Sequence, residues 1–238
     1  MPDQPPKTIG LIQSRGLGDI IIALPIARFF ANQGHRVLWP IDRRAVDSFS
    51  TAAPYVTFLP LEKDARGKWF YETPRALLEG HSCDEIIPLY SYLSSHPDLT
   101  LPRLTSLKFD EYKYARAGVP FREKWALSIE RDRDREERFF RKIIKTEPYV
   151  CCHLQGSDGR AIYDVGRIAA GRPIIEITAA TNNLFDWLMV IERAAHFVAV
   201  DSCFSNLVDQ LGLDMPKTFI RRSDIAFTPV LGQAWDLV

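Results

Sequence analysis

The chain has 238 residues, of which 46% are hydrophobic and 11% aromatic, so it can fill the cores of two small domains and is not intrinsically disordered. Thirty basic residues balance thirty acidic ones, and this neutrality gives no support to a broad nucleic-acid-binding or anionic-membrane surface. No apolar run approaches the ~20 residues of a membrane span, and the first six residues lack the charged and apolar regions of a signal peptide.

The four cysteines are predicted to be buried free thiols. Cys151 and Cys152 are adjacent in an apolar strand, where their side chains face opposite ways. Neither they nor Cys83 and Cys203 show the spacing of a metal site, so we expect no bound metal. Free thiols are typical of a reducing compartment, and we expect a cytoplasmic protein.

The first predicted unit is a strand, a glycine turn and a helix. Residues 8–13 are an apolar run of buried-strand type, and residues 20–33 are apolar at helical spacing and end at Gly34. The turn Ser14-Arg15-Gly16-Leu17-Gly18-Asp19 between them has the geometry of a nucleotide-phosphate site. A carboxylate at Asp19 would repel a diphosphate, yet the helix dipole favours its charged form. Asp19 therefore suits a general base better than a phosphate site.

The next strands extend this unit into a parallel sheet. Strands are predicted over residues 35–41, 55–61 and 84–90, with helical segments between them. A loop rich in Ser and Pro over 91–106 follows the last of these strands. Ligands of open α/β sheets bind at this carboxyl edge.

An aromatic patch and a charged helix separate the two halves of the chain. Residues 108–126 include Phe109, Tyr112 and Tyr114, which we expect to close the core of the first domain. Charges alternate densely from Glu130 to Lys142, and this pattern predicts a solvated linker helix. The predicted organisation is an N-terminal domain over 1–128, a linker over 129–147 and a C-terminal domain over 148–238.

The second half repeats the alternation of strands and helices. Strands are predicted at 149–154, 173–178, 196–200 and 217–220, and helices near 161–170, 184–195 and 204–211. Polar residues gather just beyond two strand ends, at 155–160 and 201–206. We interpret this half as a second Rossmann-like domain whose ligand edge faces the first domain.

Three stretches resemble glycosyltransferase family 9, the heptosyltransferase family. Gly16-x-Gly18-Asp19, followed by Leu24-Pro25 and Phe29, looks like the opening of that family. Residues 196–206 resemble its second motif, and residues 153–160 are similar to the loop that holds the donor phosphates. The resemblance covers most of the chain in order. It implies the GT-B architecture, an α/β fold with two Rossmann-like parallel-sheet domains facing across a cleft.

The resemblance also implies roles for individual residues. Asp19 takes the place of the base that deprotonates the acceptor, and Arg160 stands where the family usually has a phosphate-binding Lys. The implied donor- and phosphate-binding residues are Gly16, Gly18, Gln155, Gly156, Ser157, Arg160, Asp201, Ser202 and Asn206. Cys203 replaces the family's usual Gly and Asn206 its usual His. The C-terminal domain is also shorter than the family's, and no residue matches the acid that contacts the donor ribose.

The function implied is glycosyl transfer that inverts the anomeric centre and needs no metal or other cofactor. Asp19 would take the proton of the acceptor hydroxyl as it attacks the anomeric carbon. Arg160 and the N–H groups of helix N-termini near Gly156 and Ser202 would meet the charge on the departing diphosphate. The partners expected are a nucleotide-diphosphate-sugar and an acceptor saccharide, lipid-linked glycan or other hydroxyl compound.

Two other functions fit parts of the sequence. Gly16-x-Gly18, with Asp42 at the end of the second strand, is also found in NAD-dependent oxidoreductases, although Ile21 stands in place of the third glycine. The altered motif over 201–206 fits a nucleotide- or sugar-binding protein that keeps the fold without the chemistry. For three residues we also weigh a structural role: His153 as a satisfied core histidine, Glu176 as an edge residue facing solvent, and Asp201 as a helix N-cap.

Overall fold

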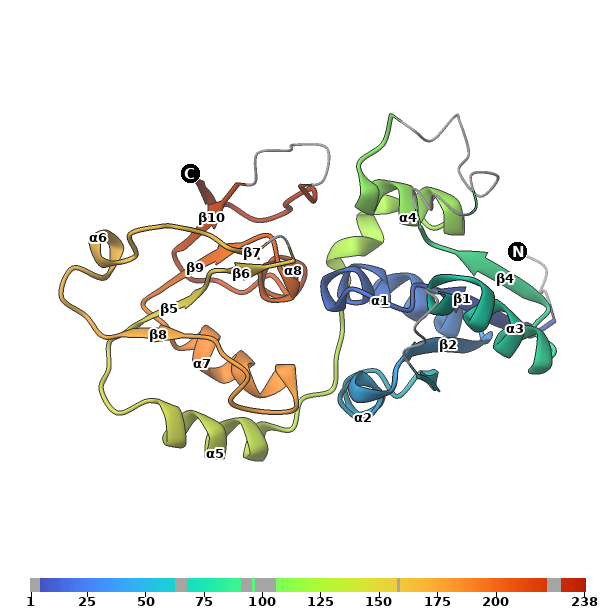
Figure 1. Cartoon of the computed structure of the whole chain (residues 1–238), viewed down its shortest axis with the longest axis horizontal. Coiled ribbons are helices and arrows are strands. Elements are labelled where there is room, and N and C mark those ends of the chain that lie inside the picture. The colour runs from blue at the N-terminus through green and yellow to red at the C-terminus, as the bar shows by residue number, and fades with distance from the viewer. Residues whose placement is uncertain (1–4, 63–67, 91–95, 97–105, 158, 222–227) are drawn as a thin grey trace. The chain divides into compact units, whose positions relative to one another are not determined.

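The computed structural model describes residues 5–62, 68–90, 96, 106–157, 159–221 and 228–238. The chain divides into two units, Met1–Ile129 and Glu130–Val238, which are coloured blue to green and yellow-green to red in Figure 1. The predicted loop over 91–106 lies largely outside the described residues.

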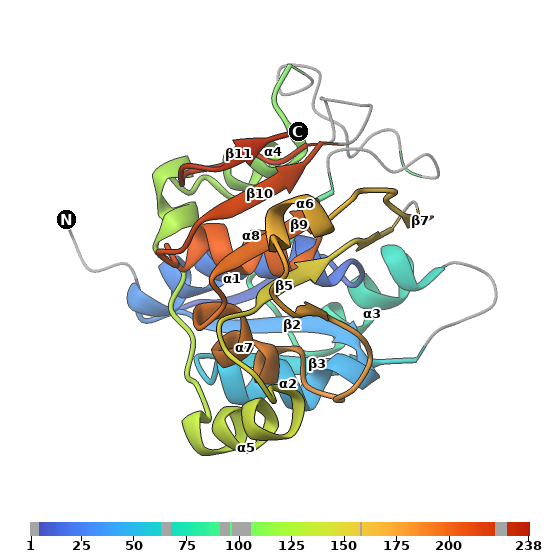
Figure 2. The same ribbon diagram turned by 90° about the vertical axis from the view of Figure 1, so that its left-hand side faces the viewer.

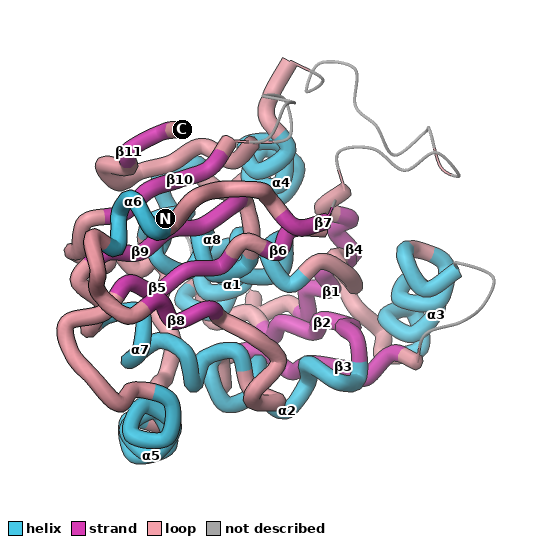
Figure 3. Tube along the Cα trace, turned by 60° about the vertical axis from the view of Figure 1, so that its left-hand side comes forward, coloured by secondary structure: helices cyan, strands magenta, loops and turns pink. Residues whose placement is uncertain are grey.

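A four-stranded parallel sheet forms the centre of the first unit. Its order is β3-β2-β1-β4, which Figure 3 shows as a row of magenta segments. The central strand β1 pairs on both sides, so that Gly10 lies opposite Leu38 on one side and Ile86 on the other. The strands are β1 (Thr8–Ile12), β2 (Arg36–Asp42), β3 (Val56–Leu61) and β4 (Glu85–Pro88). All four predicted strands are therefore present.

The helices of this unit connect and cover the strands. The α-helices are α1 (Leu17–Asn32), α2 (Arg43–Ala52), α3 (Glu72–Gly80) and α4 (Phe109–Ala117), with 3₁₀ turns η1 (Lys68–Phe70) and η4 (Phe121–Trp125). Tyr112 and Tyr114 on α4 are fully buried, and the Tyr114 hydroxyl donates a hydrogen bond of 2.8 Å to the carbonyl of Ile22. The prediction that residues 108–126 close the core is confirmed.

The second unit has a five-stranded parallel sheet of order β11-β10-β9-β5-β8. Figure 2 shows β5, β9, β10 and β11 beside one another. Strands β5, β8, β9 and β10 lie where the sequence predicts strands. The bounds are β5 (Val150–His153), β8 (Ile174–Glu176), β9 (His196–Val200), β10 (Lys217–Ile220) and β11 (Asp236–Leu237). Two elements were not predicted. One is β11, and the other is an antiparallel ribbon of β6 (Gln155–Gly156) and β7 (Gly159–Arg160).

Helices and short turns join these strands. They are α5 (Arg133–Ile143), α6 (Gly166–Ala169), η5 (Leu184–Trp187), α7 (Leu188–Glu192) and α8 (Cys203–Gln210). The helix predicted over 184–195 is thus a 3₁₀ turn that continues into a short α-helix. Its predicted start is confirmed, because the side chain of Asn183 accepts a hydrogen bond of 3.0 Å from the backbone N–H of Phe185.

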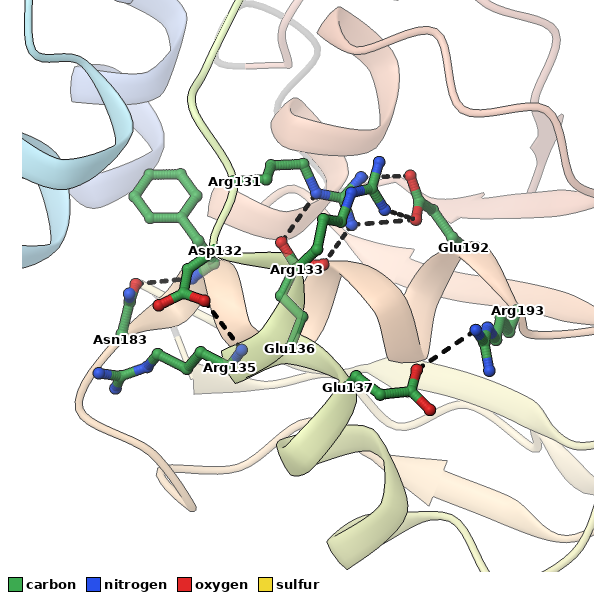
Figure 4. A network of polar contacts seen from close by, with 10 residues as sticks. Arg131, Asp132, Arg133, Arg135, Glu136, Glu137, Asn183, Glu192 and Arg193 are labelled. Atoms are coloured by element: carbon green, nitrogen blue, oxygen red, sulfur yellow. Dashed lines mark hydrogen bonds and ion pairs between the residues drawn. The ribbon is translucent and has the colours of Figure 1, made fainter.

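Helix α5 packs within the second unit, beside α7 (Figures 1 and 2). Its buried Phe139 lies edge-on to Trp187 with ring centres 4.9 Å apart. Arg131, just before the helix, forms ion pairs with Glu136 of α5 and Glu192 of α7 (Figure 4). The segment expected to be a solvated linker helix therefore has one face in the core of this unit.

A buried carboxylate holds the end of the chain against α8. Both oxygens of Asp209 accept a hydrogen bond of 3.0 Å from the backbone N–H of Gly232, and one also accepts from the indole N–H of Trp235 at 3.1 Å. The sequence provides no motif around Asp209. Its role is evident only in the fold, where the residues before β11 lie against helix α8.

Candidate functional site

The turn between β1 and α1 positions Asp19. Gly16 is the N-cap of α1 and has φ +76°, a backbone conformation that favours glycine. A Cβ atom on Gly16 would lie 2.4 Å from Oδ2 of Asp19. The glycine therefore leaves the space into which the Asp19 carboxylate folds, and Gly18 lies in the first turn of the same helix.

The Asp19 carboxylate pairs with a buried lysine. Nζ of Lys113, on α4, lies 2.9 Å from Oδ1 of Asp19, and the Lys113 side chain is only 3% exposed against 35% for Asp19. The same ammonium donates hydrogen bonds of 2.8 Å to Oε1 of Gln13 and 3.3 Å to the carbonyl of Leu89. Lys113 thus ties α4 to the ends of β1 and β4 and holds one oxygen of Asp19. Among the described residues, none donates a hydrogen bond to the other oxygen, Oδ2.

Sequence reasoning did not identify Lys113. It lies within the aromatic stretch predicted to be core. A lysine in such a stretch is expected on the solvent-exposed face of the helix, because lysine side chains are rarely fully buried. Three oxygens surround its ammonium in the fold, one each from helix α1, the residue after β1 and the residue after β4. Only the tertiary structure brings those acceptors to the same point.

Aromatic side chains lie next to this turn. The hydroxyl of buried Ser14 donates a hydrogen bond of 2.7 Å to the carbonyl of Trp69, and it is 3.0 Å from the hydroxyl of Tyr90. The Arg15 guanidinium lies over the rings of Trp69 and Phe70. Ser14 therefore joins the end of β1 to the turn η1 and to Tyr90, which follows β4. This junction lies next to the turn that carries Asp19.

In the second unit, Arg160 already has a carboxylate partner. Its guanidinium donates two hydrogen bonds to Glu176 of edge strand β8, and one of them is 2.8 Å long from Nη2 to Oε2. This pair raises the pKa of Arg160 and lowers that of Glu176, in both cases chiefly through the side-chain hydrogen bond. Glu176 is therefore not a plain solvent-facing edge residue. A phosphate that binds Arg160 must share its N–H groups with Glu176 or displace the carboxylate.

The rest of the predicted phosphate loop is the β6–β7 ribbon. Gln155 is exposed, and its side-chain nitrogen donates a hydrogen bond of 3.1 Å to the carbonyl of Gly156. Ser157 forms the turn, and Asp158 lies outside the described residues. The ribbon brings Gln155 and Arg160 opposite one another.

The predicted loop over 201–206 is organised by its own hydrogen bonds. Ser202, and not Asp201, is the N-cap of α8, because Ser202 and Ser205 bond to each other's backbone N–H. Asn206 is buried, and its side-chain nitrogen donates to the carbonyl of Ser202 at 2.9 Å and reaches Oδ1 of Asp201 at 3.5 Å. The alternative reading of Asp201 as the N-cap is wrong.

His153 ends strand β5, directly before the ribbon. Its Nδ1 is buried and has no hydrogen-bond partner among the residues that the structure describes, and its ring lies edge-on to Phe204 at 4.8 Å. Burial lowers the pKa of His153 to about 4, so the ring is neutral at pH 7. The expectation of a satisfied core histidine is therefore wrong in one respect, since one ring nitrogen is unsatisfied.

Solved structures of glycosyltransferases share this architecture. A family 9 glycosyltransferase from Veillonella parvula superposes with a TM-score of 0.66 at 15% identity, over 98% of this chain and 86% of that one. This chain has the GT-B fold of that glycosyltransferase. The E. coli heptosyltransferase WaaC with ADP-2-deoxy-2-fluoro heptose gives a TM-score of 0.52 at 15% identity, over 97% of this chain and 92% of that one. No family model and no curated protein matches the sequence.

Two longer solved structures have a similar fold. The iron-containing dodecameric glycosyltransferase TibC from enterotoxigenic E. coli has a TM-score of 0.60 at 14% identity, over 95% of this chain. A second TibC structure, in complex with ADP-D-beta-D-heptose, gives 0.59 at 14% identity over 99% of this chain. The chain spans 61% and 63% of the length of these two structures. At these identities the similarity establishes the fold, and the two predicted Rossmann-like units are confirmed.

Other predicted features can be placed on this fold. Asp42 is the N-cap of α2, and its side chain accepts a hydrogen bond of 3.0 Å from the backbone N–H of Arg44. The acid that could bind the ribose of NAD therefore caps a helix in this fold. All four cysteines are free, and burial raises the pKa of Cys152 to about 11 and that of Cys203 to about 12. In the described part of the chain, no group of three or more His, Cys, Asp or Glu side chains is placed to hold a metal, and no helix is long and apolar enough to cross a bilayer.

Proposed function

We propose that the protein is a glycosyltransferase that moves a sugar from a nucleotide-diphosphate-sugar to an acceptor hydroxyl, with Asp19 as the general base. The observation that carries this proposal is the Asp19 carboxylate, which is held through Oδ1 by buried Lys113 at the carboxyl edge of a parallel sheet. A fixed carboxylate at a ligand-binding edge, within the fold of known glycosyltransferases, is suited to accept a proton from a bound hydroxyl.

The free oxygen of Asp19 defines the proposed chemistry. Oδ2 would take the proton of the acceptor hydroxyl while the acceptor oxygen bonds to the anomeric carbon of the donor. The bond between that carbon and the diphosphate oxygen breaks in the same step, and its electrons leave with the diphosphate. Because the base acts on the acceptor and forms no bond to the sugar, the anomeric configuration is inverted.

The second unit is proposed to hold the donor. Arg160 would meet the diphosphate by exchanging Glu176 for phosphate oxygens, and the N–H groups at the start of α8, beyond Ser202, would meet the remaining charge. Gln155, Gly156 and Ser157 would contact the phosphates through the ribbon. The other proposed donor contacts are Gly16, Gly18, Asp201 and Asn206. We propose that Arg160 and these N–H groups meet the charge of the departing diphosphate without a metal or other cofactor. We also propose that transfer takes place in the cytoplasm.

The base assignment is tested with an amide substitution. WaaC and TibC were solved with ADP-2-deoxy-2-fluoro heptose and ADP-D-beta-D-heptose, so ADP-sugars are the first donors to test, beside UDP-sugars. In Asp19→Asn, donor binding measured by calorimetry is expected to stay within about threefold of wild type. Transfer to acceptors is expected to fall by at least about 1,000-fold, because the amide cannot take the proton. Asp42→Asn is the control and should retain transfer.

Three results would count against this proposal. Turnover by Asp19→Asn at the wild-type rate would remove Asp19 as the base. Binding of NAD in place of any nucleotide-sugar would favour the oxidoreductase. If the wild-type protein binds a nucleotide-sugar but transfers it to no acceptor, it is a binding protein of this fold. The pairing of Arg160 with Glu176 and the internal hydrogen bonds of Asn206 would then explain the lack of transfer.

A further inference from the structure

The side chain of Arg15 is held in place beside the proposed base but has no part in the chemistry above. Its guanidinium carbon lies 4.1 Å from the ring centre of Trp69 and 4.5 Å from that of Phe70. The two rings are tilted by 55° with centres 5.6 Å apart, so the cation is attracted to two aromatic faces at once. Its orientation is therefore largely set before any ligand arrives.

The two rings are themselves fixed. Trp69 is buried, and its carbonyl accepts the 2.7 Å hydrogen bond from the Ser14 hydroxyl. The ring of Phe70 meets Tyr90 edge to face at 6.2 Å, and the Tyr90 hydroxyl also binds Ser14. The stack is thus anchored to the ends of β1 and β4, and it is not a chance contact of a flexible side chain.

The hydrogen-bond donors of Arg15 meet no acceptor in the part of the chain that the structure describes. A guanidinium has five N–H donors in its plane, and stacking on a ring occupies its face and not its edge. Among the described residues, none accepts a hydrogen bond from the Arg15 side chain. By contrast, Arg43 pairs with Glu62 and Arg44 with Asp42 on the same sheet edge. Arg15 is also exposed, so its donors are open to a ligand.

The position of Arg15 links these donors to the reaction. It precedes Gly16 and is four residues before Asp19, so their Cα atoms are at most about 14 Å apart even for a fully extended chain. A molecule of saccharide size can therefore contact both side chains. The base acts on the acceptor, so a group bound by Arg15 belongs to the acceptor under the proposed function.

We propose that Arg15 binds an oxyanion of the acceptor, and that the acceptor is therefore an acidic hydroxyl compound carrying a carboxylate or a phosphate. The planar guanidinium forms two parallel hydrogen bonds with either group, which would fix the distance from that anion to the hydroxyl that Asp19 deprotonates. The assignment of the anion to the acceptor rests on the proposed function. The binding of an anion at Arg15 does not.

The test is a titration of the full chain labelled with ¹⁵N-arginine and followed by NMR of the Nε–Hε groups. Sodium acetate and methyl phosphate are added separately, with sodium chloride at equal ionic strength as the reference. The Arg15 signal, identified by its loss in Arg15→Lys, is expected to shift saturably with both anions at millimolar affinity. Arg28 is the matched control, because it also stacks on a ring, that of Tyr55, but its Nε is bonded to Asn32.

Two outcomes would overturn the proposal. The first is a chemical-shift change of the Arg15 signal that is no larger than in chloride, or no larger than that of Arg28. In that case the stack only holds the η1 turn in place. In Asp19→Asn, removal of a neighbouring negative charge is expected to tighten anion binding at Arg15 by about twofold. An unchanged affinity would mean that the anion does not lie beside the base. The stronger of the two anions identifies carboxylate or phosphate, and no step of the titration needs a donor or turnover.

Discussion

At the scale of single residues, the Asp19 carboxylate can take its position only because Gly16 has no Cβ atom. The glycine both adopts a positive φ and leaves room for Oδ2, whereas Lys113 holds Oδ1 from the other side. The carboxylate is therefore positioned from two directions by residues 3 and 94 positions away in the sequence. The glycine was evident from the motif and the lysine was not, because only the first contact is local.

Gly16→Ala separates this steric role from backbone strain. The added Cβ would displace the Asp19 carboxylate, and we expect kcat to fall by about 100-fold, as for a misplacement of about 1 Å. Gly34→Ala is the control, because Gly34 also has a positive φ, +82°, but a Cβ there meets nothing within 4 Å. Each variant should lose about 1 kcal/mol of unfolding free energy. Equal activity of the two variants in a transfer assay would show that the Asp19 contact is unimportant.

At the scale of elements, the β6–β7 ribbon and edge strand β8 together decide how Arg160 is presented. Strand β8 pairs in parallel with β5, and this register puts Glu176 opposite Cys152, close to the ribbon that follows His153. The sequence predicted β8 as a strand and the ribbon as a loop. It could not predict that the Glu176 carboxylate of the strand would bind the Arg160 guanidinium of the ribbon. Sixteen residues separate them, and their meeting depends on sheet order.

Glu176→Gln is expected to improve the binding of diphosphates. The amide carries no negative charge to compete for Arg160, so the dissociation constants of ADP, UDP and inorganic pyrophosphate should fall by about threefold, the size expected for an exposed ion pair. Calorimetry at low salt measures the change. Glu137→Gln is the matched control, since Glu137 also pairs with arginines and its side chain is 30% exposed against 33% for Glu176. Weaker binding in Glu176→Gln would instead indicate that Glu176 contacts the donor directly.

At the scale of the whole molecule, each unit has its own hydrophobic core. One cluster includes Ile12, Leu38 and Leu78, and another includes Val150, Cys152 and Val198. The charged segment that begins at Glu130 belongs to the second of these units, because Arg131 bonds to Glu136 and Glu192 (Figure 4). A change in that network should therefore affect one unit more than the other.

Arg131→Met tests this separation. The substitution leaves buried Glu136 without its cation, and we expect a loss of about 3 kcal/mol in the unfolding free energy of the second unit. Hydrogen exchange should speed up in β5, β9 and β10 and stay unchanged in β1 and β2. Arg133→Met removes a second, exposed partner of Glu192 and should cost less than about 1 kcal/mol. Faster exchange throughout the chain would contradict independent cores.

The sequence by itself determined the elements that depend on local chemistry. Apolar runs between polar turns marked eight strands, β1 to β5 and β8 to β10. Gly16, Gly18 and Asp19 marked the turn before α1, because glycine conformation and helix polarity act over a few residues. The tertiary structure alone decided which charges pair. Lys113 reaches Asp19, Glu176 reaches Arg160 and Asp209 reaches the chain end only because sheet order and helix packing bring distant residues within about 3 Å.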